Sequence, residues 1–166
     1  LEGLADADLV IEAVFEDPQV KLATYAQVEA AAPDDAVLTT NTSAIPIREL
    51  SAALKHPERF LGAHWFNPPQ WVPCVEVIPG PDTLEAVVKR MVDFLASIGK
   101  QPVTVGDAAG FVANRIQFAM FKEAVSCVAD GIAEPEDIDR IVSSSFGFRL
   151  PFFGPFAIAD MAGLDV

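Results

Sequence analysis

Short apolar runs rich in β-branched residues alternate with stretches of helical periodicity from residue 8 to residue 106. Runs of this kind predict buried strands, and apolar residues spaced by three and four positions predict amphipathic helices. The expected strands lie within residues 8–14, 36–43, 59–69, 74–80 and 101–107, and the expected helices lie near 18–32, 46–54 and 82–98. The resulting order, β-α-β-α-β-β-α-β, is typical of an α/β protein with a doubly wound parallel sheet.

The pattern changes after Gly106, where the strand-like runs stop. Helices are expected over residues 111–131, from Glu134 to about Ser145, and from residue 154 onward. We therefore predict two domains. The first is a partial doubly wound sheet in residues 1–106, and the second is an all-helical domain that begins in residues 107–166.

Charge and hydropathy argue against several classes of partner. The net charge is −13, from 24 acidic and 11 basic residues, whereas a nucleic-acid-binding protein needs a basic surface. No apolar run approaches the length of about 20 residues that a membrane-spanning helix needs. The opening segment has neither a Met nor a basic leader, so we expect a piece of a longer reading frame and not a secreted precursor.

The sequence contains none of the common metal or nucleotide motifs. GxGxxG, P-loop, HExxH and GxSxG patterns are all missing, and no metal site is expected. Cys74 and Cys127 lie in apolar surroundings without CxxC spacing. This usage predicts reduced core cysteines in a cytoplasmic protein.

The two histidines have different surroundings. His56 lies among charged residues before a proline, which predicts a surface turn without a function. His64 lies in an apolar run, near the end of an expected strand. A lone histidine in such a run is more often a packed core residue than a catalyst, but α/β sheets bind ligands at the carboxyl ends of their strands. Both interpretations remain open at this point.

Glu76 is the expected partner of His64. Strand alternation places Cys74, Glu76 and Ile78 on one face and the two valines between them on the other. A carboxylate in such apolar surroundings is costly unless it is paired. Because only a loop separates the two strands, a His64–Glu76 hydrogen bond would satisfy both groups and prepare the imidazole for proton transfer. The alternative is a buried ion pair without a catalytic role.

Two further polar positions have equally open interpretations. The cluster from Thr39 to Ser43 follows an apolar strand. Its hydroxyl groups and the amide of Asn41 could bind a ligand, or the hydroxyl groups could cap the next helix. Asn114 lies among core-like residues at the start of an expected helix, and its amide needs a partner in the backbone or in a ligand.

The motifs TNTS, GAHWFNPP, VEVI and GFVANR follow DLVIEAVFED in this order. Together they closely resemble the L-3-hydroxyacyl-CoA dehydrogenase family over essentially the whole chain. The loop PQWVPC is similar to the branch that contains short hydroxybutyryl-CoA dehydrogenases and lambda-crystallin, whose relatives also act on L-gulonate or carnitine. In this branch Trp71 would either shape the acyl pocket or simply pack.

The resemblance implies a role for individual residues. His64 would be the catalytic base and Glu76 its partner, with Ser43 and Asn114 holding the substrate. Glu16, Lys21, Ser43 and Asn67 would contact the cofactor NAD. The implied reaction transfers a hydride between NAD and C3 of a 3-hydroxyacyl-CoA, the carbon that bears the hydroxyl group. Alternatives are a same-fold dehydrogenase for L-gulonate or carnitine, or a non-catalytic fragment of crystallin type.

The resemblance also implies that residues 1–106 are the C-terminal part of a Rossmann-like NAD-binding domain. The glycine-rich unit that holds the pyrophosphate would precede Leu1, so we expect this chain alone to bind NAD weakly or not at all. We also expect the strand edge at residues 8–14 to be covered by another chain or by preceding residues. The helical domain would contribute to a homodimer, with GLDV leading into further helix.

Overall fold

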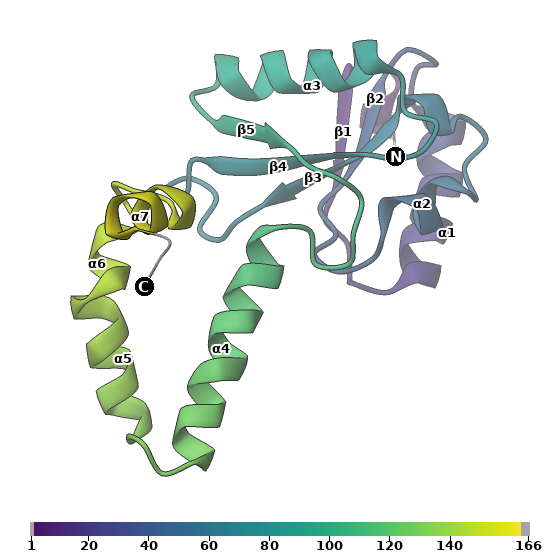
Figure 1. The fold of residues 1–166 in the computed structure, drawn as a ribbon. Coiled ribbons are helices and arrows are strands. Elements are labelled where there is room, and N and C mark those ends of the chain that lie inside the picture. Colours follow the sequence, from purple (N-terminus) through teal and green to yellow (C-terminus); the bar gives the residue numbers. More distant parts are fainter. Residues whose placement is uncertain (1, 164–166) are drawn as a thin grey trace. The chain divides into compact units, whose positions relative to one another are not determined.

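In the computed structural model, which describes residues 2–163, five strands form one sheet in the order β1-β2-β3-β4-β5 (Figure 1). The strands are β1 (Leu9–Glu12), β2 (Val37–Thr40), β3 (Phe60–Trp65), β4 (Cys74–Pro79) and β5 (Gln101–Thr104). The chain divides into two compact units, Leu1–Arg115 and Ile116–Val166, which we call the sheet unit and the helical unit. The predicted α/β class and the succession of strands and helices are confirmed.

The sheet is mostly parallel, as the predicted doubly wound class requires, with one antiparallel pair. β1, β2 and β3 run parallel to one another and β5 runs parallel to β4, but β3 and β4 are antiparallel. The reason is the short loop of residues 66–73, since a parallel crossover needs about a dozen residues or more. As a result, His64 lies directly opposite Glu76 in the register of the two strands.

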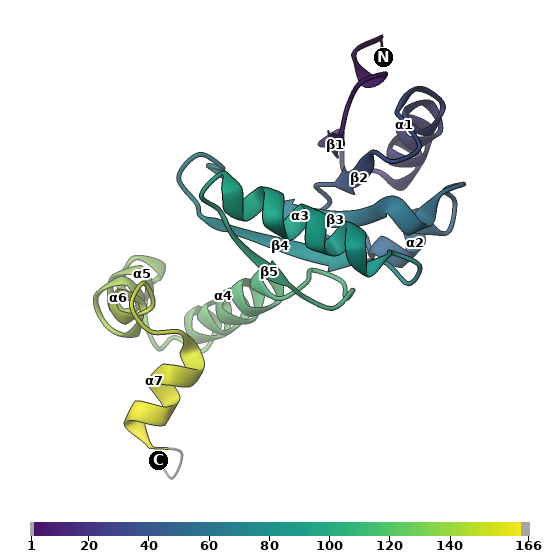
Figure 2. The ribbon, with the colours of Figure 1, turned by 90° about the horizontal axis from the view of Figure 1, so that it is seen from above.

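Helices cover both faces of the sheet. Helices α1 (Pro18–Ala31) and α2 (Ile47–Ser51) lie on one face, and α3 (Glu85–Ser97) lies on the other (Figures 1 and 2). One core cluster joins Tyr25 and Leu50 to the first face, while the second joins Met91 to the opposite face. Two short 3-10 helices, Glu2–Leu4 and Pro57–Arg59, were not predicted.

Local capping explains the helix ends. Asp17 caps α1 by accepting hydrogen bonds from the backbone N–H groups of Gln19 and Val20, and Pro18 occupies the first turn as predicted. Gly99 follows α3 with φ +79°, a left-handed conformation that favours glycine. The backbone N–H of Lys100 then donates to the carbonyl of Leu95 and closes the helix.

The helical unit contains most of α4 (Ala113–Ala129), followed by α5 (Pro135–Ser144), α6 (Phe146–Arg149) and α7 (Pro155–Ala162). The short helix α6 was not predicted. Between residues 116 and 163 no side chain is buried. Many large apolar side chains there are exposed, including Phe118, Phe121 and Phe156. The predicted continuation of helix from GLDV lies largely outside the described residues.

Several other predictions concern the exposure of individual residues and of the edge of the sheet. Within the described part of the chain, β1 has a strand partner on one side only, so the predicted cover of its edge stays a prediction. Cys74 and Cys127 are free thiols, but both are half-buried and not core residues. His56 is exposed, as predicted. Among residues 2–163, no helix has both the length and the apolar character needed to cross a membrane.

Gly62 provides a test of how closely α2 packs on β3. A Cβ atom at this position would lie 2.6 Å from Cδ1 of Ile47 and 3.1 Å from Cβ of Ile78. We expect Gly62→Ala to lower the free energy of unfolding by about 1–3 kcal/mol, because the added methyl group overpacks the core. Urea unfolding measures this, and Gly3→Ala, with no neighbour within 4 Å, is the control. Equal stability of the two variants would contradict the packing.

Candidate active site

The site is centred on His64, the penultimate residue of β3. Its Nδ1 lies 2.8 Å from Oε2 of Glu76, and the side chains of both residues are 4 % exposed. The cross-strand register explains the contact, because directly opposed residues project from the same face of the sheet. The predicted pairing of these two groups is therefore present in the structure. No hydrogen bond of the second ring nitrogen, Nε2, occurs among the described residues.

Glu76 also holds the beginning of α4. Its Oε1 accepts hydrogen bonds from the backbone N–H groups of Val112, at 3.0 Å, and Ala113, at 2.9 Å. An ionised carboxylate has only acceptors, so we assign Oε2 as the acceptor in the contact with His64. The Nδ1 atom of His64 must then carry the proton that it shares with Glu76, which leaves Nε2 as the unprotonated nitrogen of the neutral ring.

Two phenylalanine rings enclose the imidazole. The ring centroid of Phe66 lies 4.6 Å from that of His64, and the centroid of Phe111 lies 5.4 Å away. Phe111 is 1 % exposed and has φ +47°. This left-handed conformation costs a residue with a side chain about 1–2 kcal/mol. The turn directs the next two backbone N–H groups to Glu76.

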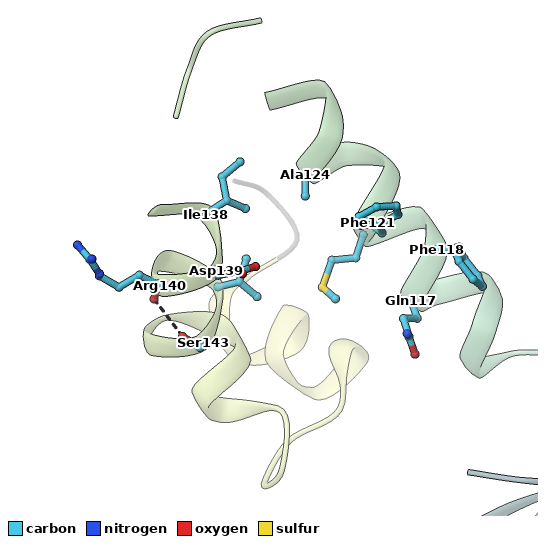
Figure 3. A pocket seen from close by; sticks show the side chains of 10 residues that line it. Gln117, Phe118, Phe121, Ala124, Ile138, Asp139, Arg140 and Ser143 are labelled. Atoms are coloured by element: carbon cyan, nitrogen blue, oxygen red, sulfur yellow. Dashed lines mark hydrogen bonds between the residues drawn. The ribbon is translucent and has the colours of Figure 1, made fainter. Parts of the chain in front are cut away.

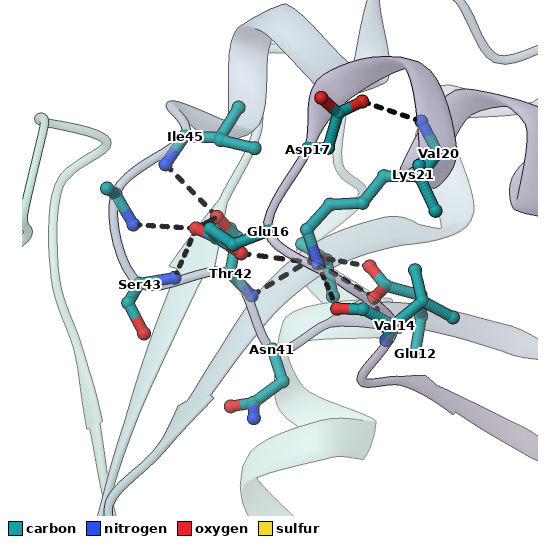
Figure 4. Close-up of polar contacts among 12 residues, drawn as sticks. Glu12, Val14, Glu16, Asp17, Val20, Lys21, Asn41, Thr42, Ser43 and Ile45 are labelled. Atoms are coloured by element: carbon teal, nitrogen blue, oxygen red, sulfur yellow. Dashed lines mark hydrogen bonds and ion pairs between the residues drawn. The ribbon is translucent and has the colours of Figure 1, made fainter.

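Ser43, Asn114 and Glu16 meet at the carboxyl ends of β1 and β2. Nδ2 of Asn114 donates to the carbonyl oxygen of Ser43 at 3.3 Å. The backbone N–H of Ser43 donates to Oε1 of Glu16 at 2.9 Å, as Figure 4 shows. The peptide groups of Ser43 are thus fixed by two residues from distant parts of the chain. The structure therefore brings these three predicted site residues together.

Hydrogen bonds keep Glu16 ionised. Partial burial by itself raises the pKa of Glu16. The hydroxyl of Thr42, the backbone N–H groups of Ser43 and Ala44, and the charge of Lys21 outweigh that effect and lower the pKa below its ordinary value of 4.5. Oε1 accepts all three hydrogen bonds, while Oε2 lies 3.4 Å from Nζ of Lys21.

A lowered pKa makes Glu16 stabilising only while it is ionised. Its contribution is complete above its unfolded pKa near 4.5 and is lost as the pH falls through the lower folded value. We expect Glu16→Gln to reduce the loss of stability between pH 5 and about pH 3. Urea midpoints across this range measure the effect, which will be modest because the side chain is 40 % exposed. Parallel pH curves for both proteins would contradict it.

Lys21 lies in a buried network that was not predicted as a whole. Its Nζ is 2.7 Å from Oε1 of Glu12, and both side chains are 1 % exposed. The other oxygen of Glu12 accepts from the hydroxyl of Thr40 at 2.8 Å and lies 3.2 Å from that of Tyr25. Burial and the nearby charge of Glu12 raise the pKa of Tyr25, which stays neutral. A carboxylate inside an apolar run was the signal that could have identified Glu12.

Comparison with known proteins places this arrangement in a family. Residues 1–108 match the sequence model described as 3-hydroxyacyl-CoA dehydrogenase, NAD binding domain. Residues 110–166 match the one described as 3-hydroxyacyl-CoA dehydrogenase, C-terminal domain. The chain belongs to the 3-hydroxyacyl-CoA dehydrogenase family. NAD is the cofactor that this family of dehydrogenases uses.

Several members of the family are similar over the whole chain. The 5-formyl-3-hydroxy-2-methylpyridine 4-carboxylate 5-dehydrogenase of Mesorhizobium japonicum is 42% identical over 99% of this chain and 54% of its own length. A crystal structure of such an enzyme, described as an NAD+ dependent dismutase, has a TM-score of 0.94, with 42% identity over 98% of this chain and 53% of that one. The (S)-3-hydroxybutyryl-CoA dehydrogenase from Ralstonia eutropha has a TM-score of 0.83, with 36% identity over 99% of this chain and 57% of that one. The chain thus spans about half the length of these relatives.

The remaining predicted positions of the 3-hydroxyacyl-CoA dehydrogenase pattern lie in the loop after β3. Asn67 is exposed and precedes a cis peptide bond to Pro68. No side-chain hydrogen bond joins Asn67 to His64, Ser43 or Glu16 in the described structure, so its cofactor role stays a prediction. Trp71 is 80 % exposed, so in this structure it does not pack into the core.

Two contacts that position the site were not predicted, although Asn41 belongs to the polar cluster that the sequence indicated as a candidate site. Oδ1 of Asn41 accepts from the backbone N–H of Trp65 at 2.9 Å and ties β2 to β3 beside His64. Asp107 accepts from the backbone N–H groups of Ile47 and Arg48, both at 2.9 Å, and so caps α2 from a distant segment. Neither contact could be read from local sequence, because each joins segments far apart in the chain.

Proposed function

We propose that the protein containing this chain is an NAD-dependent dehydrogenase that oxidises a hydroxyl group through proton transfer to His64. The observation that carries this proposal is the contact of 2.8 Å between Nδ1 of His64 and Oε2 of Glu76. An acceptor-only carboxylate on one nitrogen leaves the other as a base for a substrate hydroxyl. Family membership supports the same reaction class.

The exposed polar groups fit the nicotinamide half of NAD. Among the described residues, Oε2 of Glu16 has only the ion pair with Lys21. Ser43 and Asn67 are exposed at neighbouring strand ends. Such polar groups could form hydrogen bonds with the ribose hydroxyls and the carboxamide of the nicotinamide half of NAD. NAD supplies the hydride acceptor when it is bound. Because the chain has no GxGxxG turn, we retain the prediction that it binds NAD weakly by itself, and micromolar affinity in a titration would overturn this.

The chain's own residues would then perform the proton transfer. Nε2 of His64 takes the proton of the substrate hydroxyl as the hydride leaves the carbon that bears this hydroxyl. The charge of Glu76 stabilises the imidazolium that forms. In the reverse direction the imidazolium returns the proton to the ketone oxygen. Ser43 and Asn114 would hold the substrate oxygens. They would orient the substrate and would form no covalent bond with it.

For the substrate we propose a (3S)-3-hydroxyacyl-CoA. The family match and the resemblance to hydroxybutyryl-CoA dehydrogenases support this choice. A second candidate is a formyl- or hydroxymethyl-substituted pyridine carboxylate, which the 42% identity to the Mesorhizobium enzyme favours. The loop PQWVPC also resembles that of enzymes acting on L-gulonate or carnitine, so both compounds belong in the test of the substrate.

A substrate panel with the full-length protein distinguishes these candidates. We expect acetoacetyl-CoA to be reduced with NADH far faster than 5-formyl-3-hydroxy-2-methylpyridine 4-carboxylate, and L-gulonate and carnitine to be oxidised poorly with NAD. His64→Gln should abolish the activity with the best substrate. Preference for the pyridine would replace the acyl-CoA assignment. No turnover of any substrate would reject the dehydrogenase in favour of a non-catalytic protein of crystallin type.

We also propose that the helical unit mediates a homodimer. A groove of about 590 Å³ between α4 and α5 is lined largely by apolar side chains, among them Phe121 and Ile138 (Figure 3). Because monomers rarely expose apolar patches of this kind, a second copy would cover them. Sedimentation equilibrium of the full-length protein should give a dimer that Phe121→Asp weakens. A monomer at micromolar concentration would overturn the proposal.

A further inference from the structure

Phe111 packs on His64 and immediately precedes the two residues that bind Glu76. Its ring lies 5.4 Å from the imidazole, centroid to centroid. The two residues that follow it donate their backbone N–H groups to Oε1 of Glu76. Among the described residues, Phe111 is also the only one other than glycine with a left-handed φ. Ring packing and backbone direction thus come from the same residue.

The backbone of Phe111 explains how an apolar segment can bind a carboxylate. Gly110, with φ +73°, and Phe111, with φ +47°, form two successive left-handed residues just before α4. Such turns bring consecutive N–H groups to one side of the chain, where they bind an anionic oxygen. Strained backbone of this kind persists only where surrounding contacts hold it, and it clusters at functional sites.

The side chain of Phe111 explains how the imidazole is kept in one orientation. The ring of His64 is hydrogen-bonded on one nitrogen only among the described residues, so its orientation depends on this one contact and on the side chains packed around it. Phe66 and Phe111 approach the imidazole at interplanar angles of 60° and 55°. Aromatic packing of this kind restricts the ring and keeps water from its sides.

We propose that Phe111 is a positioning residue that fixes the imidazole of His64 on Glu76. The inference rests on the proposed function only for its kinetic consequence. The geometric part concerns which nitrogen of His64 carries the proton and whether the ring stays in a single orientation. A residue that only fills the core would affect stability without changing either property.

The test compares Phe111→Leu with Phe60→Leu in the full-length protein. Phe60 belongs to the same core cluster and is fully buried, but its ring packs on Tyr25 and not on His64. We expect both variants to lose stability to a similar extent. Only Phe111→Leu should lower kcat, by about 10- to 100-fold with KM nearly unchanged, because misplacement of a catalytic group acts on the chemical step.

A spectroscopic measurement separates this inference from the proposed function. In ¹⁵N NMR spectra, Phe111→Leu should show His64 as a mixture of ring tautomers or as broadened signals, while Phe60→Leu keeps the wild-type pattern. Phe111→Met, which conserves more of the side-chain volume, should change the spectrum in the same direction if the leucine variant folds poorly. Wild-type ring signals in a folded Phe111 variant would overturn the inference. Absence of dehydrogenase activity in the wild type would instead reject the proposed function.

Discussion

Glu76→Gln is expected to reduce kcat by about 10³- to 10⁴-fold while leaving the fold intact, because it reverses the tautomer of His64. The two backbone N–H groups at Val112 and Ala113 need an acceptor, so the new amide must turn its oxygen to them. Its NH₂ group then faces Nδ1 of His64. That nitrogen becomes the acceptor, so the ring proton moves to Nε2, which can then no longer accept the proton of the substrate hydroxyl.

The measurement is steady-state kinetics of the full-length protein with the best substrate of the panel. Glu85→Gln is the matched control, since Glu85 is an exposed residue at the start of α3. Amide chemical shifts of Val112 and Ala113 should stay close to those of the wild type in both variants. Near-normal kcat in Glu76→Gln would mean that the carboxylate does not set the tautomer of His64.

Lys21→Met is expected to lower the free energy of unfolding by about 3–5 kcal/mol, the usual cost of leaving one charge of a buried ion pair without its partner. Among the described residues, the donors left to the carboxylate of Glu12 would be the hydroxyls of Thr40 and Tyr25 and the backbone N–H of Val14. In the double variant Glu12→Gln/Lys21→Met most of the loss should be recovered, because no unpaired charge remains in the interior; Glu16, the other neighbour of Lys21, is 40 % exposed and stays solvated.

Urea unfolding of the single and double variants measures this coupling. Lys89→Met provides the control, since Lys89 pairs with Asp93 on the exposed face of α3, where both side chains are more than half exposed. Such surface pairs add little stability, so its unfolding midpoint should stay unchanged. A double variant as unstable as Lys21→Met would contradict the account of a coupled buried pair.

The parts of the fold that follow from local chemistry could be predicted from the sequence. Pro18 begins α1 and Gly99 ends α3 because each residue suits the backbone at its position. Strand alternation was enough to place Glu76 on a buried face, and the cost of a buried carboxylate was enough to predict its partner. The placement of Ser43 and Asn114 relied on family resemblance, and the structure brings them together.

Other parts depend on tertiary contacts that no local pattern contains. The pairing of Glu12 with Lys21 was missed because the apolar run around Glu12 was interpreted only as a strand. The left-handed backbone of Phe111 accompanies the hydrogen bonds of the next two residues to Glu76, whereas phenylalanine itself disfavours that conformation. The domain boundary predicted at residue 106 and the roles assigned to Glu16, Lys21 and Asn67 stay predictions.

The ring tautomer of His64 is the property on which the account depends most directly. Two-bond ¹H–¹⁵N correlation spectra of the wild-type protein at neutral pH distinguish which ring nitrogen carries the proton. The contacts of Glu76 predict protonated Nδ1 and unprotonated Nε2. A neutral ring protonated on Nε2 would contradict the account, because His64 could then accept no proton from a substrate.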